Sequence, residues 1–321
     1  MKTAKRMTLS VIGFILAAVI FGTATYAWIG LATINTIDGV YLSATTGQFL
    51  DISLDGETWS QSVDPNTLEE IFDGVELIDI TSNDGKTFTT GGLKAVEEAR
   101  ANTHYLSFVL YFRTTEREKD LFLVNNVNSI ASYDTNPRGT FVVSRGVTWR
   151  STHTFANGPG IDDIVERGQA GEYFAANAVR IALVEEKMPD NILDERSPET
   201  LLSVIYDPSE DETRGFGKTY GAYSFFVNKT GAYSYRIPDE APDTMYSLTT
   251  FEPFDPYQAQ NNDSHFATLV PNGETNEEGR PWHVAQVRVN VWIEGWDADA
   301  FDAIDRDRIK IQLEFKTGMK A

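Results

Sequence analysis

The sequence predicts a mainly β protein: an antiparallel, jelly-roll-like β-sandwich with a few short helices, preceded by an N-terminal hydrophobic helix. Three observations support this prediction. Many segments of residues 37–321 alternate apolar and polar residues, which is the pattern of a strand with one buried face. Few segments carry helix start and stop signals, and serial strands with few helices favour antiparallel sheets. The third observation is a long uncharged run near the N-terminus.

The first 36 residues predict an export signal or a membrane anchor. Lys2, Lys5 and Arg6 precede residues 7–37, which contain no charged side chain. A helix over residues 9–29 would be about 31 Å long and would match the roughly 30 Å hydrocarbon core of a bilayer. The basic end is expected to stay cytoplasmic, so residues 37–321 are expected to face outward as one extracellular domain.

Two interpretations of this segment remain open. Cleavage after Ala27 would make it a signal peptide, because the peptidase requires a small residue at that point. An uncleaved segment would be an anchor, with Trp28 at the membrane interface. The flanking charges disfavour a third interpretation, a buried helix of a cytosolic protein. The predicted localisation is therefore extracellular or cell surface, either secreted or anchored.

The strands are predicted from apolar periodicity. Clear alternation covers residues 40–44, 49–54, 286–294 and 308–315. Residues 104–113 predict a long aromatic strand that forms a hairpin with residues 121–127. Residues 177–185 are almost continuously apolar, which predicts a central strand.

Helix and loop signals are fewer. Residues 65–72 begin with proline after Asp64, a typical N-cap, and predict one short helix. Residues 298–304 predict a turn of helix between the last two strands. The phrase Gly-Ala-Tyr-Ser occurs at residues 221–224 and again at 231–234, which predicts a hairpin of two similar strands. Residues 251–280, rich in Pro, Asn and Asp, predict a long loop inserted at the sandwich rim.

Composition excludes several classes of protein. A net charge of −20 repels phosphate backbones, so we expect no nucleic-acid partner. The absence of cysteine excludes disulfides, thiol catalysis and Cys-ligated metals. No G-x-S-x-G, P-loop or G-x-G-x-x-G motif occurs, and the histidines are isolated. We therefore expect no enzymatic activity and nominate no catalytic residue.

Two groups of residues are candidate ligand sites. Asp297, Asp299 and Asp302 belong to an Asp-rich stretch whose oxygens are candidate calcium ligands, although the EF-hand pattern is missing. The simpler interpretation is a solvated acidic loop, and no other cofactor is expected. Trp282 and Trp296 are candidates for a sugar-binding face, against the alternative that they are core aromatic residues.

Residues 24–56 resemble the exported matrix-fibre and camelysin-like proteins of Gram-positive bacteria, the TasA type. The likeness rests on Thr25-Tyr26-Ala27-Trp28 and on residues 47–52, GQFLDI. Residues 287–304 look like the closing strands of uncharacterised surface proteins that share a "YAW" N-terminus. The resemblance implies a jelly-roll domain that assembles into extracellular biofilm-matrix fibres with other copies of itself.

In such fibres a segment of one subunit completes the sheet of the next, which is β-strand addition. Residues 29–36 suit this role because they are uncharged, rich in β-branched residues and free of proline. The donor-strand candidates are Ile29, Leu31, Thr33 and Ile34.

Two alternatives to a strand-exchange fibre remain. The first is a monomeric adhesin or carbohydrate-binding module, held in the membrane by its N-terminal helix if that helix is uncleaved. The second is a pilin-like subunit with the N-terminal helix in the filament core. Residues 5–9 are similar to a type IV pilin leader, but the glycine before the cleavage point and the glutamate at the fifth helix position are missing.

Overall fold

The structure is a computed structural model that describes residues 33–321 except 46–48, 91–96, 126, 128–129, 136, 232 and 234–235. The predicted N-terminal helix lies outside the described residues, as do Ile29 and Leu31. The described chain is mainly β, as predicted. It has two short α-helices, α2 (Pro65–Phe72) and α3 (Ala222–Thr230), and three 3₁₀ turns, η1 (Ala175–Ala178), η2 (Pro198–Thr200) and η3 (Asp302–Ile304).

Fourteen strands of the described chain form one large sheet. Nine of them lie side by side in this order: β14 (Thr244–Met245), β13 (Ser203–Tyr206), β12 (Val179–Glu186), β17 (Pro281–Glu294), β3 (Glu76–Thr81), β1 (Ile34–Ala44), β18 (Arg308–Gly318), β6 (Asp120–Leu123) and β15 (His265–Thr268).

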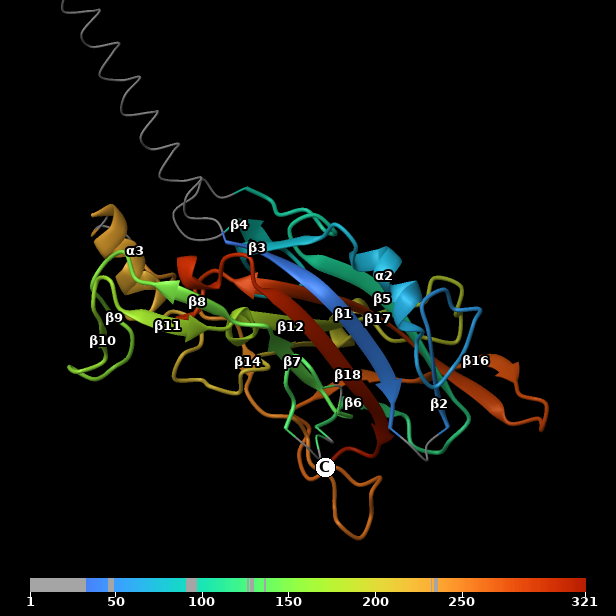
Figure 1. The fold of residues 1–321 in the computed structure, drawn as a ribbon. Helices are drawn as coiled ribbons and strands as arrows, with labels where there is room; N and C mark the ends of the chain where they lie inside the picture. Colours follow the sequence, from blue (N-terminus) through green and yellow to red (C-terminus); the bar gives the residue numbers. More distant parts are fainter. Residues whose placement is uncertain are drawn as a thin grey trace, which may run out of the picture.

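Five further strands extend this sheet. They are β16 (Val270–Thr275) and β5 (Leu106–Thr114) on β17, β2 (Leu50–Ser53) on β5, β4 (Thr89–Thr90) on β3, and β7 (Phe141–Ser144) on β18. Two small ribbons, with helix α3, gather at one end of the molecule (Figure 1): β8 (Val147–Arg150) with β11 (Ala170–Tyr173), and β9 (Phe155–Ala156) with β10 (Ile164–Val165).

The predicted antiparallel sandwich is wrong in its topology. The sheet is mixed, because β1 runs parallel to β18, β3 runs parallel to β17, and β13 runs parallel to β14. Figure 1 shows β1 and β18 side by side although they come from opposite ends of the described chain. Alternation reports which face of a strand is buried but carries no information on the direction of its neighbour. The sequence of β1 or of β18 therefore does not indicate that the two strands pair in parallel.

The sheet curls into a half-barrel around one main core. Strand β15, at one end of the strand order, approaches β12 near the other end, where Thr268 N–H donates to Glu185 Oε1 at 3.0 Å. Phe112, Phe266 and Phe315 meet inside with ring centroids 5.0–5.9 Å apart. Burial of these aromatic rings from three strands stabilises the curl.

Three local predictions are wrong. Residues 104–113 and 121–127 form no hairpin, because β5 pairs with β17 and β2, whereas β6 pairs with β18 and β15. The repeated Gly-Ala-Tyr-Ser phrase does not mark two strands, since the first copy begins helix α3 and Gly231 ends that helix with a left-handed φ of 71°. Residues 251–280 are not one loop, because they contain β15 and β16.

Other local predictions are confirmed. Helix α2 spans the predicted residues, and the Asp64 side chain accepts a hydrogen bond from Asn66 N–H as its N-cap. Strand β12 is buried and lies between β13 and β17. The predicted turn between the last two strands is η3. Each of these three predictions depends on a sequence pattern of only a few neighbouring residues.

Candidate functional site

The three candidate calcium ligands each face a basic side chain. Asp297 Oδ2 lies 2.5 Å from Arg180 Nη2, Asp299 accepts a fork of hydrogen bonds from Arg214, and Asp302 Oδ2 lies 2.5 Å from Lys229 Nζ. Among the residues described, no group of three or more potential ligands could hold a metal ion. The geometry therefore places these acids in separate ion pairs.

Arg180 is the centre of a buried ionic cluster at the end of the sheet. It lies on β12 with 1% of its side chain exposed, and its Nη2 also lies 2.8 Å from Asp207 Oδ2 at the end of β13. Glu294, fully buried at the end of β17, accepts hydrogen bonds from Trp292 Nε1 and Trp296 N–H. The cluster joins the ends of three neighbouring strands.

Burial dominates the titration of these acids. The pKa of Asp297 is raised to about 7, mainly by burial, and nearby Asp299 and Asp207 contribute to the rise while Arg180 opposes it. Burial also raises the pKa of Glu294 and of Asp207. Buried carboxylates that outnumber the guanidiniums favour a bound proton, because desolvation disfavours the charged form.

The pH dependence of stability is expected to report this proton. Because the folded-state pKa of Asp297 lies above its unfolded value, its protonation stabilises the folded state. The free energy of unfolding should rise as pH falls from about 7 towards 4, by up to about 1.4 kcal/mol per pH unit from this group. Urea unfolding of the wild type and Asp297→Asn between pH 8 and pH 5 measures the difference in slope. Equal slopes would contradict the assignment.

The two candidate tryptophans lie at opposite ends of one long strand. Trp282 lies near the start of the long strand β17, and Trp296 follows its end. The guanidinium of Arg113 is stacked between Trp282 and Trp59, 4.3 and 4.5 Å from the two ring centroids. Arg113 also pairs with Asp51 at 2.9 Å. This stack attaches the loop that carries Trp59 to the sheet, so Trp282 has a structural role of its own.

Thr33 and Ile34, two of the donor-strand candidates, are held within their own subunit. Thr33 is 2% exposed and its N–H donates to Asp79 Oδ1. Ile34 begins β1 and pairs with Ile78 of β3. The part of the donor-strand segment that could pair with another subunit therefore ends before Thr33.

One open strand edge is apolar. Strand β7 pairs with β18, and no other described strand pairs with it. Arg145 N–H donates to Arg308 O, and in an antiparallel pair every second residue forms such hydrogen bonds with the neighbouring strand. Val142 is one of the intervening residues, so its N–H and C=O point away from β18. A cavity of about 410 Å³ lies over β7, with its walls formed by residues 131–134 and 174–177. Its lining includes the apolar side chains of Val142, Val143 and Phe174 and the charged side chains of Asp134 and Arg145.

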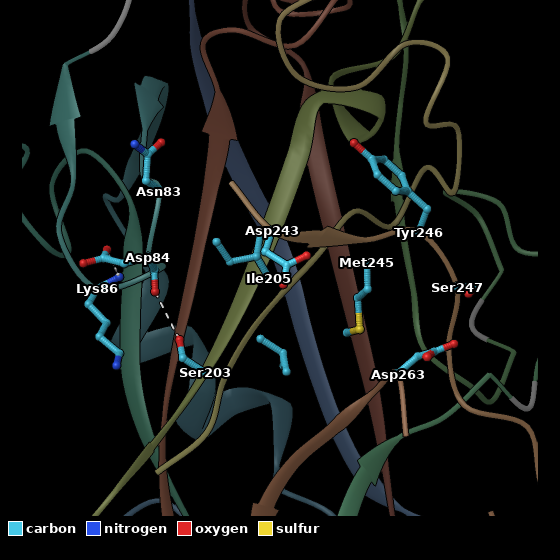
Figure 2. A pocket seen from close by; sticks show the side chains of 11 residues that line it. Asn83, Asp84, Lys86, Ser203, Ile205, Asp243, Met245, Tyr246, Ser247 and Asp263 are labelled. Atoms are coloured by element: carbon cyan, nitrogen blue, oxygen red, sulfur yellow. Dashed lines mark hydrogen bonds between the residues drawn. The ribbon is translucent and has the colours of Figure 1, made fainter. Parts of the chain in front are cut away.

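A second open edge is acidic. Strand β14 pairs with β13 only at Ile205 and Tyr206, so Ser203 at the start of β13 pairs with β12 on one side and has no strand of the described chain on its other side. A cavity of about 520 Å³ lies here (Figure 2). Its lining residues are Asn83, Asp84, Lys86, Ser203, Val204, Ile205, Asp243, Met245, Tyr246, Ser247 and Asp263.

Sequence reasoning missed both open edges and the Arg180 cluster. One signal was available for the cluster: Arg180 is the single basic residue inside the apolar run of residues 177–185. A charge in a run that predicts a buried strand requires a buried partner. The partners Asp207 and Asp297 have no such signal, because both occur in stretches rich in other acids.

Comparison with known proteins finds no matching family model, no similar curated protein and no similar solved structure. In the part of the chain that is described, no helix is long and apolar enough to cross a membrane.

Proposed function

We propose that this protein is a non-enzymatic structural subunit of the cell surface, exported and assembled into extracellular fibres by β-strand addition. The observation that carries the proposal is the apolar open edge of β7 beneath its cavity. An added strand needs unpaired backbone groups for its hydrogen bonds and apolar pockets for alternate side chains. The β7 edge supplies both, from Val142 and from the Val143 and Phe174 lining.

The donor in this proposal is the segment just before Thr33, residues 28–32 of a second copy. It contains Ile29 and Leu31 on one face of a strand, uncharged and without proline. Charged side chains on an edge oppose strand addition. The β7 cavity carries one acidic and one basic side chain, Asp134 and Arg145, whereas the cavity at Ser203 carries three acidic side chains and one basic one. The uncharged donor therefore suits the β7 edge better than the acidic edge at Ser203.

Removal of residues 28–32 should abolish fibres while leaving the domain folded. The deletion stops before Thr33 so that β1 keeps its contacts within the domain. One of these contacts is made by Asn35, which is fully buried and accepts a hydrogen bond from Asp307 N–H. Electron microscopy and sedimentation measure assembly, and urea unfolding checks the fold. Fibres of unchanged length and yield would contradict a donor role.

The acceptor is tested separately. Val142→Pro removes a backbone N–H that points away from β18, so the existing strand pair should survive. The matched control Val142→Thr keeps that N–H and the side-chain shape. Fibre assembly should be lost in the first variant and retained in the second. Equal assembly of both variants would exclude β7 as the acceptor edge.

A further inference from the structure

We propose that the acidic edge at Ser203 is a second binding site, specific for an extended peptide that carries lysine or arginine side chains between apolar ones. The site is distinct from the β7 edge and does not depend on fibre formation. The unpaired backbone would bind the main chain of the peptide, the apolar floor would bind an aliphatic side chain, and the acidic walls would bind a cationic side chain.

The backbone contribution comes from Ser203, which pairs with a strand on one side only. Leu202 C=O accepts a hydrogen bond from Glu185 N–H, so the next residue, Ser203, directs its own N–H and C=O away from β12. Strand β14 begins opposite Ile205 and does not reach Ser203. The cavity occupies the place where β14 would continue, and an extended peptide laid there can form main-chain hydrogen bonds.

The floor of the cavity is apolar. Val204, Ile205 and Met245 line it, and its volume of about 520 Å³ falls within the range of about 300–1,000 Å³ that is typical of ligand sites. Figure 2 shows Ile205 at the centre, with Lys86 and Asp84 on one side and Met245 and Asp263 on the other. One aliphatic side chain of the peptide fits over Ile205.

The charge of the walls selects the partner. Three carboxylates, those of Asp84, Asp243 and Asp263, face one ammonium, that of Lys86. Asp84 is ionised near neutral pH: hydrogen bonds from Thr87 and Lys86 N–H outweigh the effect of burial and lower its pKa. Asp243 and Asp263 are exposed. The excess negative charge is complementary to a cationic side chain.

Fluorescence anisotropy of a labelled Val-Lys-Val-Lys-Val peptide tests the site with the full chain. We expect saturable binding that weakens about fivefold in Asp243→Asn/Asp263→Asn and loses much of its salt dependence, in line with two exposed ion pairs. The matched control Glu277→Gln, in the turn between β16 and β17, should bind as the wild type does.

A second pair of variants tests the backbone contribution. Ser203→Pro should weaken binding at least tenfold, whereas Ser203→Ala should not. If Ser203→Pro fails to fold, a peptide with alternate backbone nitrogens methylated makes the same test from the ligand side and should not bind.

Three results would overturn the proposal. The first is no binding of the lysine peptide at millimolar concentration. The second is equal binding of a Val-Gln-Val-Gln-Val peptide. The third is equal affinity for spermidine with no effect of backbone methylation, which would identify a diffuse cation surface.

Discussion

Replacement of Arg180 by methionine is expected to lower the free energy of unfolding by about 3–5 kcal/mol. The substitution leaves Asp207 and Asp297 buried, at 0% and 1% exposure, with their guanidinium removed. Removing one partner of a buried ion pair costs more than the pair itself contributes, because the remaining charge is uncompensated. Urea unfolding followed by tryptophan fluorescence measures the loss.

Two further variants test whether the loss comes from charge rather than packing. Arg288→Met breaks a half-exposed pair with Glu186, with Arg288 41% exposed, and should cost less than about 1 kcal/mol. The triple variant Arg180→Met/Asp207→Asn/Asp297→Asn removes the stranded charges and should recover part of the stability. A triple variant as unstable as Arg180→Met would show that the lost side-chain volume is responsible.

Replacement of Gly221 by alanine is the second large effect, a loss of about 2–6 kcal/mol in the free energy of unfolding. Gly221 precedes helix α3 with a φ of 62° and a ψ of −126°, a backbone conformation used almost only by glycine, which costs another residue about 1–3 kcal/mol. Its N–H donates to Ala156 O, and an alanine Cβ would overlap the carbonyl oxygen of Ala298. Relief of that overlap requires backbone movement, which costs about 1–3 kcal/mol more.

Gly231 is the matched control at the other end of the same helix. Its φ is 71°, but a Cβ there would meet nothing within 4 Å. Gly231→Ala should therefore cost only the conformational term of about 1–2 kcal/mol. Urea unfolding of both variants compares them, and equal losses would show that the contact with Ala298 is unimportant.

Both large effects arise at the junction where the α3 end of the molecule joins the sheet. The Arg180 cluster connects the ends of β12, β13 and β17, and the Gly221 segment connects α3 to β9 and to the turn after β17. The ring of Phe225 on α3 meets Phe301 from that turn at 5.4 Å. We expect this end of the molecule to lose structure first in either variant.

The secondary-structure class, and the elements with local signals, could be predicted from the sequence alone. The Asp64–Pro65 cap predicted α2 because capping involves residues that are adjacent in the chain. The apolar run of residues 177–185 predicted a buried strand because burial on both faces removes alternation. The charge of −20 and the absence of cysteine restricted the chemistry without any knowledge of the fold.

Strand direction, strand partners and the place of each candidate residue depend on contacts between distant parts of the chain. The parallel pair of β1 and β18 joins residues about 270 positions apart, and nothing local distinguishes it from an antiparallel pair. The structure has helix α3 in place of the predicted hairpin, and Gly221 and Gly231 supply the positive φ angles at its two ends. Arg180 acquired two acidic partners from distant segments, which local patterns do not encode. The open edges of β7 and β13 exist because neighbouring strands stop short, and that depends on the whole sheet.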